Sequence, residues 1–314
     1  MPQADHAAPC RTLHLLGFEG LARYVEQVQR YAAPGDAACS DEALIAQWRA
    51  AQARLADLAA AQPGPASQAD QATLAAALPA WLDARVQAVL ARPEVQASFS
   101  QVPVAPAWVE IDSLVAYQRE IDLDKADAIA AGLGPDPDLG RCFDLAFGSG
   151  QAPAAADWRL LRQKHSSWEF GSPSHDFRYL GARLFDPALL PGLAVDGRAV
   201  AAVALLLGYS ANLVSVIRLG PRWVLHNGYH RVYALRRLGI TRVPCLVEVL
   251  GSADELALVA SAEINEQAGL YFQAARPPLF MDYFDPALVR VHARPRLRRE
   301  VRLAVSVDSP LTAP

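Results

Sequence analysis

Five consecutive residues, Asn227 to Arg231, carry the side chains of this sequence that are best suited to binding phosphate. Gly228 permits a tight turn, and a helix that begins there presents unpaired backbone N–H groups, which bind anions. Arg231 has a fixed fork of donors for phosphate, and His230 can donate to the same group or transfer a proton. Tyr229 lies between Gly228 and His230 and is also expected to contact the nucleotide. The pattern predicts a phosphate site, with a nucleotide as the expected ligand and His230 and Asn227 as candidate catalytic residues.

Alternatives remain open at this level. Asn227 can bind a ribose or phosphate oxygen, or it can cap the turn. A strand–glycine–helix unit also occurs in many folds that bind no ligand, and the arginine of its first helical turn then pairs with a nearby carboxylate. His226, on the preceding strand, is expected to be a hydrogen-bonded core histidine.

The flanking sequence predicts the elements that position this turn. Residues 223–225 are apolar on both faces, which favours a strand buried between layers. Apolar residues then recur every third position in a helix whose last turn carries two arginines: Val232, Leu235, Leu238, Arg236 and Arg237. Gly239 is the expected helix end, and Pro244 opens the next strand.

The same stretch resembles the ParB/sulfiredoxin-like superfamily, over residues of about 176–250. The matching residues are Gly228, His230, Arg231, Ala234, Gly239, Val243, Pro244 and Val247. The resemblance implies a nucleotide pocket in which the G-x-H-R turn binds the phosphates. Members of the superfamily use such a pocket in a CTP-operated DNA clamp, an ATP-dependent sulfinic acid reductase, and an ATP- or ADP-dependent kinase of free serine.

Three departures from the family pattern reduce the number of activities that the resemblance implies. The reductases carry their reactive cysteine immediately before the histidine, where this chain has Tyr229. The serine kinases have an aspartate where this chain has Asn227, and asparagine cannot accept a proton from a substrate hydroxyl. The DNA clamps have an acidic residue and an arginine at the positions of Tyr229 and His230, and no basic helix-turn-helix follows here.

A polar passage at residues 164–177 contains His165, Glu169, His175 and Asp176. Their spacing matches no helical metal-binding motif, so no protein-bound metal site is predicted. Such a loop commonly satisfies its own turns. Glu169 is nevertheless a candidate catalytic residue, or a ligand of nucleotide-bound Mg²⁺.

Composition limits the class of protein. The chain has 314 residues, of which 52% are hydrophobic, a formal net charge of -4 and four cysteines without a CxxC pair. These values favour a cytoplasmic protein with free thiols, and nucleic acid is not an expected partner.

The arginine-rich run at residues 289–302 is expected to be a solvated edge strand or tail. Residues 199–217 are expected to form a buried helix and then a buried strand, with no membrane span.

The region before the phosphate motif is rich in alanine and is expected to be helical, with helices at residues 41–61, 69–91 and 113–131. The predicted fold class is α+β: an α-helical region at 1–157, a ParB/sulfiredoxin-like mixed α/β domain at 158–275, and a C-terminal strap and tail at 276–314.

The leading functional hypothesis is a protein that binds ATP or CTP with Mg²⁺, as a phosphotransferase acting on a small-molecule acceptor or as an NTPase. The alternative is a non-catalytic module with a degenerate nucleotide pocket, whose helical region binds a protein or DNA partner.

Overall fold

The computed structural model describes residues 9–32, 36–61, 75–148, 158–174, 177–187, 196–209 and 211–310. Helices and sheets both contribute, as expected for the mixed α+β class. The chain forms two compact units: residues 1–150 with 213–296, and residues 151–212 with 297–314. The second unit therefore interrupts the first, and the observed division differs from the predicted boundaries at 157 and 275.

The first unit contains most of the regular structure. Its strands are β1 (Cys10–Leu15), β2 (Ala75–Ala76), β3 (Val104–Glu110), β4 (Val115–Ala116), β5 (Glu120–Asp122), β10 (Ser215–Leu219), β11 (Arg222–Asn227), β12 (Arg242–Leu250) and β13 (Val289–Arg294). Its α-helices are α1 (Leu21–Gln29), α2 (Asp41–Ala61), α4 (Asp83–Leu90), α5 (Pro93–Ser98), α6 (Leu123–Leu133), α7 (Leu139–Phe147), α8 (Tyr229–Arg237), α9 (Leu256–Val259) and α10 (Ala262–Glu266). Short helical turns are η1 (Ala37–Cys39), η3 (Ala80–Leu82), η5 (Gly269–Gln273) and η6 (Phe280–Phe284).

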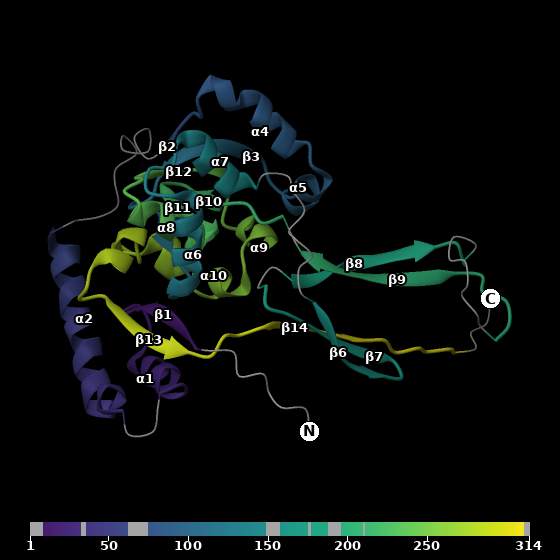
Figure 1. The fold of residues 1–314 in the computed structure, drawn as a ribbon, viewed down its shortest axis with the longest axis horizontal. Coiled ribbons are helices and arrows are strands. Elements are labelled where there is room, and N and C mark those ends of the chain that lie inside the picture. Colours follow the sequence, from purple (N-terminus) through teal and green to yellow (C-terminus); the bar gives the residue numbers. More distant parts are fainter. Residues whose placement is uncertain are drawn as a thin grey trace. The chain divides into compact units, whose positions relative to one another are not determined.

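The larger sheet of this unit has the strand order β2-β3-β12-β10-β11-β4. Figure 1 labels its strands β2, β3, β12, β10 and β11. Strand β10 pairs with β12 in parallel and with β11 antiparallel, so the sheet is mixed. One buried cluster joins this sheet to α9, α10 and η5 through Ile217, Val224, Leu256, Ile264 and Tyr271. Burial of this apolar surface is the main force that holds these elements together.

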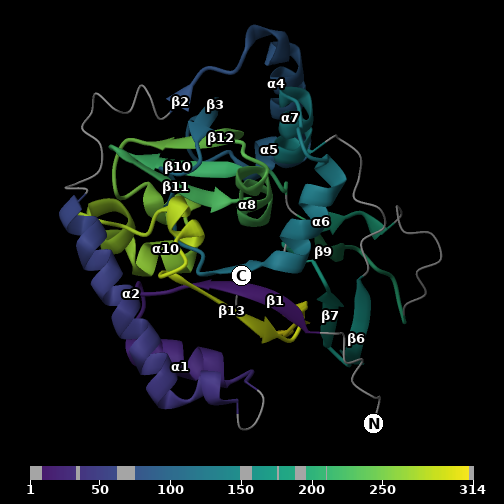
Figure 2. The ribbon, with the colours of Figure 1, turned by 60° about the vertical axis from the view of Figure 1, so that its left-hand side comes forward.

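A smaller antiparallel sheet, β13-β1-β5, joins three segments that are far apart in the sequence. Helices α1 and α2 lie beside it (Figure 2). The Trp48 indole on α2 donates to the Glu19 carbonyl, 3.0 Å away, and Arg290 on β13 donates to Gln47 on α2 at 2.8 Å. The first bond fixes the β1–α1 connection against α2, and the second fixes β13 against the same helix.

The predicted strand–turn–helix–strand unit is confirmed. Strand β11 ends at Asn227, α8 begins at Tyr229, and β12 contains Pro244. Gly239 has φ +83° just after the helix, the left-handed conformation expected of a glycine at a helix end. Local propensity, turn residues and apolar spacing all favour the same elements here.

The helical prediction for the N-terminal region is correct only in part. Helix α2 matches residues 41–61. Of the helix predicted at 69–91, the described residues form β2, η3 and α4, and residues 69–74 lie outside the described part. The helix predicted at 113–131 is wrong over its first half, where β4 and β5 precede α6. Strand pairing with distant segments explains these strands.

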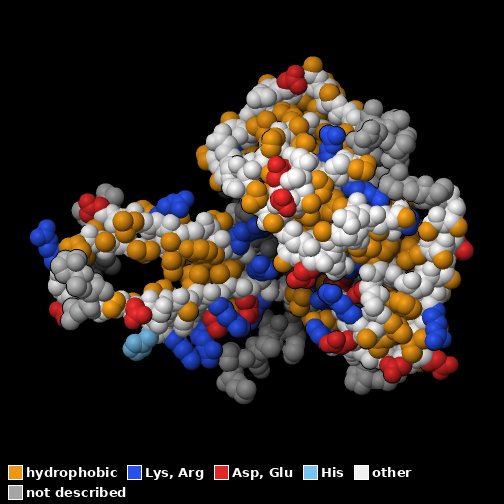
Figure 3. Space-filling model, turned by 180° about the vertical axis from the view of Figure 1, so that it is seen from behind, with side chains coloured by type: hydrophobic (Ala, Val, Ile, Leu, Met, Phe, Trp, Pro, Cys, Tyr) orange, Lys and Arg blue, Asp and Glu red, His pale blue; other side chains and the backbone are white. Residues whose placement is uncertain are grey.

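The second unit is built from β6 (Arg159–Lys164), β7 (Ser167–Ser172), β8 (Phe177–Phe185), β9 (Ala202–Tyr209) and β14 (Arg299–Ala304). They form the sheets β14-β7-β6 and β8-β9. The helix predicted within residues 199–217 is wrong, because residues 202–209 form β9; the strand predicted after it is β10. Hydrophobic side chains gather on the surface of this unit (Figure 3), including Leu184 and Val203, which are 75% and 65% exposed.

Two further findings bear on the composition-based expectations. All four cysteines are free and buried, as their spacing indicated. Among the described residues, no helix combines the length and the apolar character that a membrane span requires.

Candidate functional site

Gly228 forms the turn that precedes α8, as predicted. Its φ of +101° lies in the left-handed region, and its backbone N–H donates to the Asn227 side-chain oxygen at 2.8 Å. A Cβ atom at this position would lie 2.8 Å from the Val214 Cγ2 methyl group. The turn therefore requires glycine for two reasons, backbone conformation and close packing, and Asn227 caps it.

Tyr229 was predicted to contact the nucleotide, but the structure places its side chain in the core, only 2% exposed. The hydroxyl group accepts the backbone N–H groups of Tyr117 and Gln118, at 2.8 and 3.3 Å, and donates to the Leu225 carbonyl at 2.8 Å. Burial raises the pKa of this phenol well above its ordinary value, so it stays neutral. Tyr229 thus organises the segment between β4 and β5.

His230 and Arg231 are both half-buried and contact other segments of the first unit. The Nε2 atom of His230 accepts the Asp122 backbone N–H at 3.1 Å. The Nη1 atom of Arg231 donates to the carbonyls of Leu145 and Ala146, at 3.3 and 3.4 Å, in the last turn of α7. A cation at a helix C-terminus is favourable because of the helix dipole. The first turn of α8 thereby joins α7 to residues 117–122.

Glu169, the third predicted catalytic residue, belongs to β7 of the second unit. Its carboxylate lies 3.9 Å from Arg162 Nη1 and 3.5 Å from Arg302 Nε. Both arginines are in the same unit, so these partners give Glu169 a role in the β14-β7-β6 sheet. His175 and Asp176 lie outside the described residues.

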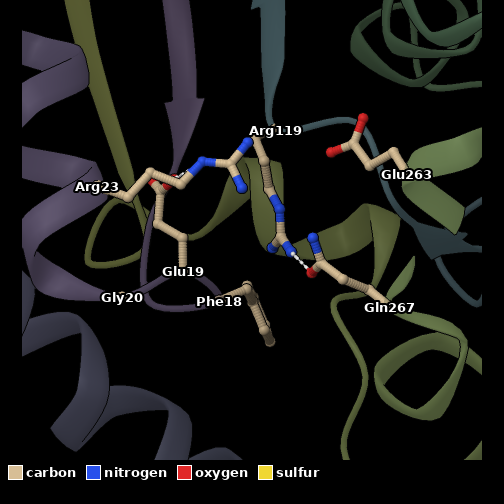
Figure 4. Close-up of a pocket in the computed structure, with 7 residues that line it drawn as sticks. All are labelled: Phe18, Glu19, Gly20, Arg23, Arg119, Glu263 and Gln267. Carbon is tan, nitrogen blue, oxygen red and sulfur yellow. Dashed lines mark hydrogen bonds and ion pairs between the residues drawn. The ribbon is translucent and has the colours of Figure 1, made fainter.

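A cavity of about 240 Å³ lies in the first unit (Figure 4), and its lining includes none of residues 227–231. It is lined by Phe18, Glu19, Gly20, Arg23, Arg119, Glu263 and Gln267. The first four come from the β1–α1 connection and α1, Arg119 comes from the segment between β4 and β5, and the last two come from α10 and the residue after it. Three distant parts of the chain therefore form this cavity.

Arg119 is the central cation of this cavity. Its Nη2 atom donates to Gln267 Oε1 at 3.3 Å and to the Tyr271 hydroxyl at 3.4 Å. Its guanidinium carbon lies 5.6 Å from the centre of the Phe18 ring, within cation–π range. The Nη1 atom has no hydrogen-bond partner among the described residues. The guanidinium group therefore has more donor capacity than its protein partners use.

The remaining charges of the cavity are mixed. Arg23 extends from α1 toward Arg119 (Figure 4); its side chain is 67% exposed, and its Nε atom is 4.0 Å from Glu19 Oε2. Glu263 lies on the other side of Arg119 in the same view. Burial, with the nearby Glu263 carboxylate, raises the pKa of Tyr117 to about 12. Two arginines and two glutamates thus favour a ligand with an anionic group that a cation accompanies.

The N-terminus of α1 adds a further anion-favouring feature. Gly20 lines the cavity and is the residue before the helix, and no side chain of the described residues caps the helix there. Backbone N–H groups at an uncapped helix start carry partial positive charge, which favours an anion nearby. The start of α1 and the two arginines therefore both favour an anion in the cavity.

The chain matches no protein-family model, and the searches of curated proteins and of solved structures gave no match either.

Reasoning from the sequence missed every residue of this cavity. Arg119 was assigned to the predicted helix at 113–131, and no local motif surrounds Arg23, Glu263 or Gln267. The only available signal was indirect: the predicted turn had to pack against some other segment, and that segment, residues 117–122, carries Arg119.

Proposed function

We propose that the first unit binds a small ligand with an anionic end, and that the phosphate end of a nucleotide such as ATP or CTP is the leading ligand. The observation that carries this proposal is the convergence of Arg119, Arg23 and the uncapped start of α1 on one cavity. Hydrogen bonds to a charged group contribute about 1.5–3 kcal/mol each, and the helix dipole about 0.3–1 kcal/mol. Arginine donors therefore dominate the expected affinity.

The size of the cavity limits what it encloses. Ligand pockets commonly measure about 300–1,000 Å³, and this cavity measures about 240 Å³. It suits a phosphate group or a similar small anion, with the nucleoside lying outside. Glu263 supports Mg²⁺ as the accompanying cation, because Mg²⁺ commonly binds one or two carboxylates together with substrate phosphates.

In this proposal the predicted turn at residues 227–231 supports the segment that carries Arg119. Tyr229 and His230 hold residues 117–122 through backbone hydrogen bonds, and Arg119 projects from that segment. In this proposal the G-x-H-R turn positions the phosphate-binding arginine. In the alternative that the resemblance implies, Arg231 itself binds the phosphate. Replacement of Arg231, and not of Arg119, would then abolish binding.

Isothermal titration calorimetry with inorganic phosphate, ADP, ATP and CTP, each with and without Mg²⁺, tests the proposal. We expect one nucleotide to bind, and Arg119→Met to weaken binding at least tenfold. Arg162→Met, which removes an exposed arginine of the second unit, should leave affinity unchanged. Binding that Arg231→Met abolishes and Arg119→Met leaves intact would place the ligand at the turn, and absence of heat with every probe would overturn the proposal.

A measurement of nucleotide turnover distinguishes an enzyme from a non-catalytic binding module. Release or transfer of phosphate by the purified full chain, lost in Arg119→Met, supports a phosphotransferase or NTPase. Binding without turnover supports the non-catalytic alternative, in which the nucleotide regulates contact with a partner.

A further inference from the structure

A second group of side chains with ligand chemistry lies on the β13-β1-β5 sheet. His14 on β1 is directly opposite Glu120 on β5, and His292 on β13 is opposite Thr12, two residues from His14 along β1. Directly opposite residues, and residues two apart on a strand, point to the same face of a sheet. The two histidines and the glutamate therefore share one face.

Their ligand atoms are close enough for one ion. One atom each from His14, Glu120 and His292 lies within 4.8 Å of the others, and His14 Nδ1 is 3.6 Å from Glu120 Oε1. Zinc bonds of about 2.0–2.1 Å in tetrahedral geometry place neighbouring ligand atoms about 3.4 Å apart. The first pair is already near that spacing, and small side-chain rotations bring in the third.

Each of the two histidines has a buried ring nitrogen without a hydrogen-bond partner among the described residues. His14 is completely buried, and the Nδ1 atoms of both His14 and His292 are buried with no hydrogen-bond partner among the described residues. A buried polar atom without a partner costs about 1–3 kcal/mol. A metal ion bound by both nitrogens would remove that cost at once.

Glu19 prepares His14 for such a role. Its Oε1 atom lies 2.6 Å from His14 Nε2. A carboxylate oxygen accepts, so Nε2 donates to Glu19, and Nδ1 is the nitrogen that remains for a metal ion. A carboxylate that holds the far nitrogen of a histidine is the usual second partner of metal-bound imidazole. This contact fixes both the tautomer and the ring orientation.

Two arginines share this face and oppose a cation; one pairs with the far oxygen of Glu120, and the other is held by partners outside the group. Arg294 pairs with Glu120 through Oε2, while Oε1 faces His14. Arg290 donates to Gln47 Oε1 at 2.8 Å and to the Ala38 carbonyl at 2.9 Å.

We propose that His14, Glu120 and His292 bind one divalent transition-metal ion of the zinc class. Two imidazoles and one carboxylate suit Zn²⁺ and Co²⁺ better than Mg²⁺ or Ca²⁺, which prefer oxygen ligands. Three protein ligands leave a fourth position for water or another ligand. The site is separate from the nucleotide proposal and does not depend on it.

Cobalt binding by the full chain provides the test. The protein is treated with a chelator, desalted, and titrated with Co²⁺ and then Zn²⁺, followed by visible absorption and calorimetry. We expect one ion per chain, d–d absorption bands of four-coordinate Co²⁺, and loss of those bands when Zn²⁺ displaces it. His292→Gln and Glu120→Gln should each weaken binding at least a hundredfold, and Glu19→Gln about 10–100-fold.

The matched control is His226→Gln. His226 is also partly buried beside one carboxylate, with Nδ1 3.2 Å from Glu248 Oε2, but among the described residues it belongs to no three-residue group of potential metal ligands. It should bind Co²⁺ like the unchanged chain. Retention of the bands in His292→Gln, equal loss in His226→Gln, or absence of stoichiometric binding would overturn the proposal. X-ray absorption of the Zn²⁺-loaded unchanged chain, which should show two imidazoles, applies even if a variant fails to fold.

Discussion

Replacement of Gly228 by alanine tests whether the turn before α8 is as tightly packed as the structure shows. The new methyl group would lie 2.8 Å from Val214 Cγ2 and 3.2 Å from the Val214 backbone Cα, on a residue with φ +101°. The backbone conformation costs a non-glycine residue about 1–2 kcal/mol. Overpacking adds about 1–3 kcal/mol. We expect Gly228→Ala to lower the free energy of unfolding by about 2–5 kcal/mol.

Gly239→Ala is the matched control, at the other end of the same helix. Gly239 has φ +83°, but no described residue has an atom within 4 Å of the position that its Cβ would take. This variant should cost only the conformational term of about 1–2 kcal/mol. Replacement of either glycine by alanine lowers the conformational entropy of the unfolded chain by the same amount. This contribution to the free energy of unfolding therefore cancels when the two variants are compared.

Urea unfolding followed by fluorescence and circular dichroism measures both variants, which lie in the same unit. Gly228→Ala should be less stable than Gly239→Ala by about 1–3 kcal/mol, the overpacking cost. In a Val214→Ala background, which removes the overlapping methyl group, the cost of Gly228→Ala should fall toward that of Gly239→Ala. Equal costs for the two variants in the unchanged chain would refute the reasoning.

Three further predictions concern groups that hold the first unit together. Tyr229→Phe leaves two backbone N–H groups and one carbonyl without their partner, so it should cost about 1–3 kcal/mol in urea unfolding and also weaken nucleotide binding; unchanged stability would contradict this. Arg276→Met should cost about 3–5 kcal/mol, because it leaves the Asp282 carboxylate, 1% exposed, buried without its cation; the double variant Arg276→Met with Asp282→Leu should recover part of the loss. Burial raises the pKa of Asp285, but hydrogen bonds from Arg54 and the Ala287 backbone outweigh it and leave the pKa below its ordinary value. The folded state then gains stability above the ordinary aspartate pKa of about 3.9, and loses it as the pH falls through the lowered value. Arg54→Gln should thus reduce stability at pH 7 slightly and remove this acid-dependent loss, as melting temperatures between pH 7 and pH 3 would show.

The unit from β11 to β12 could be predicted because its causes are local. An apolar strand, a glycine with positive φ, a helix with a three-residue apolar spacing and a terminal glycine all lie within 28 residues. Helix α2 was predictable for the same reason. The phosphate-binding role given to Tyr229 could not be checked locally. A tyrosine directly after the turn glycine can contact a ligand or place its hydroxyl group in the core. Only the approach of residues 117–118 decides between the two.

The main errors of prediction from the sequence concern strands that pair with distant segments. Residues 202–209 have the apolar character of a buried helix, yet they pair with β8, and residues 115–116 pair with β11, more than 100 positions later. A short apolar run does not distinguish a helix from a strand, because its conformation depends on which segment pairs with it.

The sequence by itself determined the elements whose hydrogen bonds and apolar contacts are made between near neighbours, together with the free thiols. The tertiary structure alone decided which polar side chains meet. Arg119 reaches the cavity beside Arg23 and Glu263, and His14 meets His292 across the β13-β1-β5 sheet, through pairings that span 96 to 278 residues. Such encounters follow from strand order and register, which depend on burial summed over the whole unit and have no signature in any single stretch of the chain.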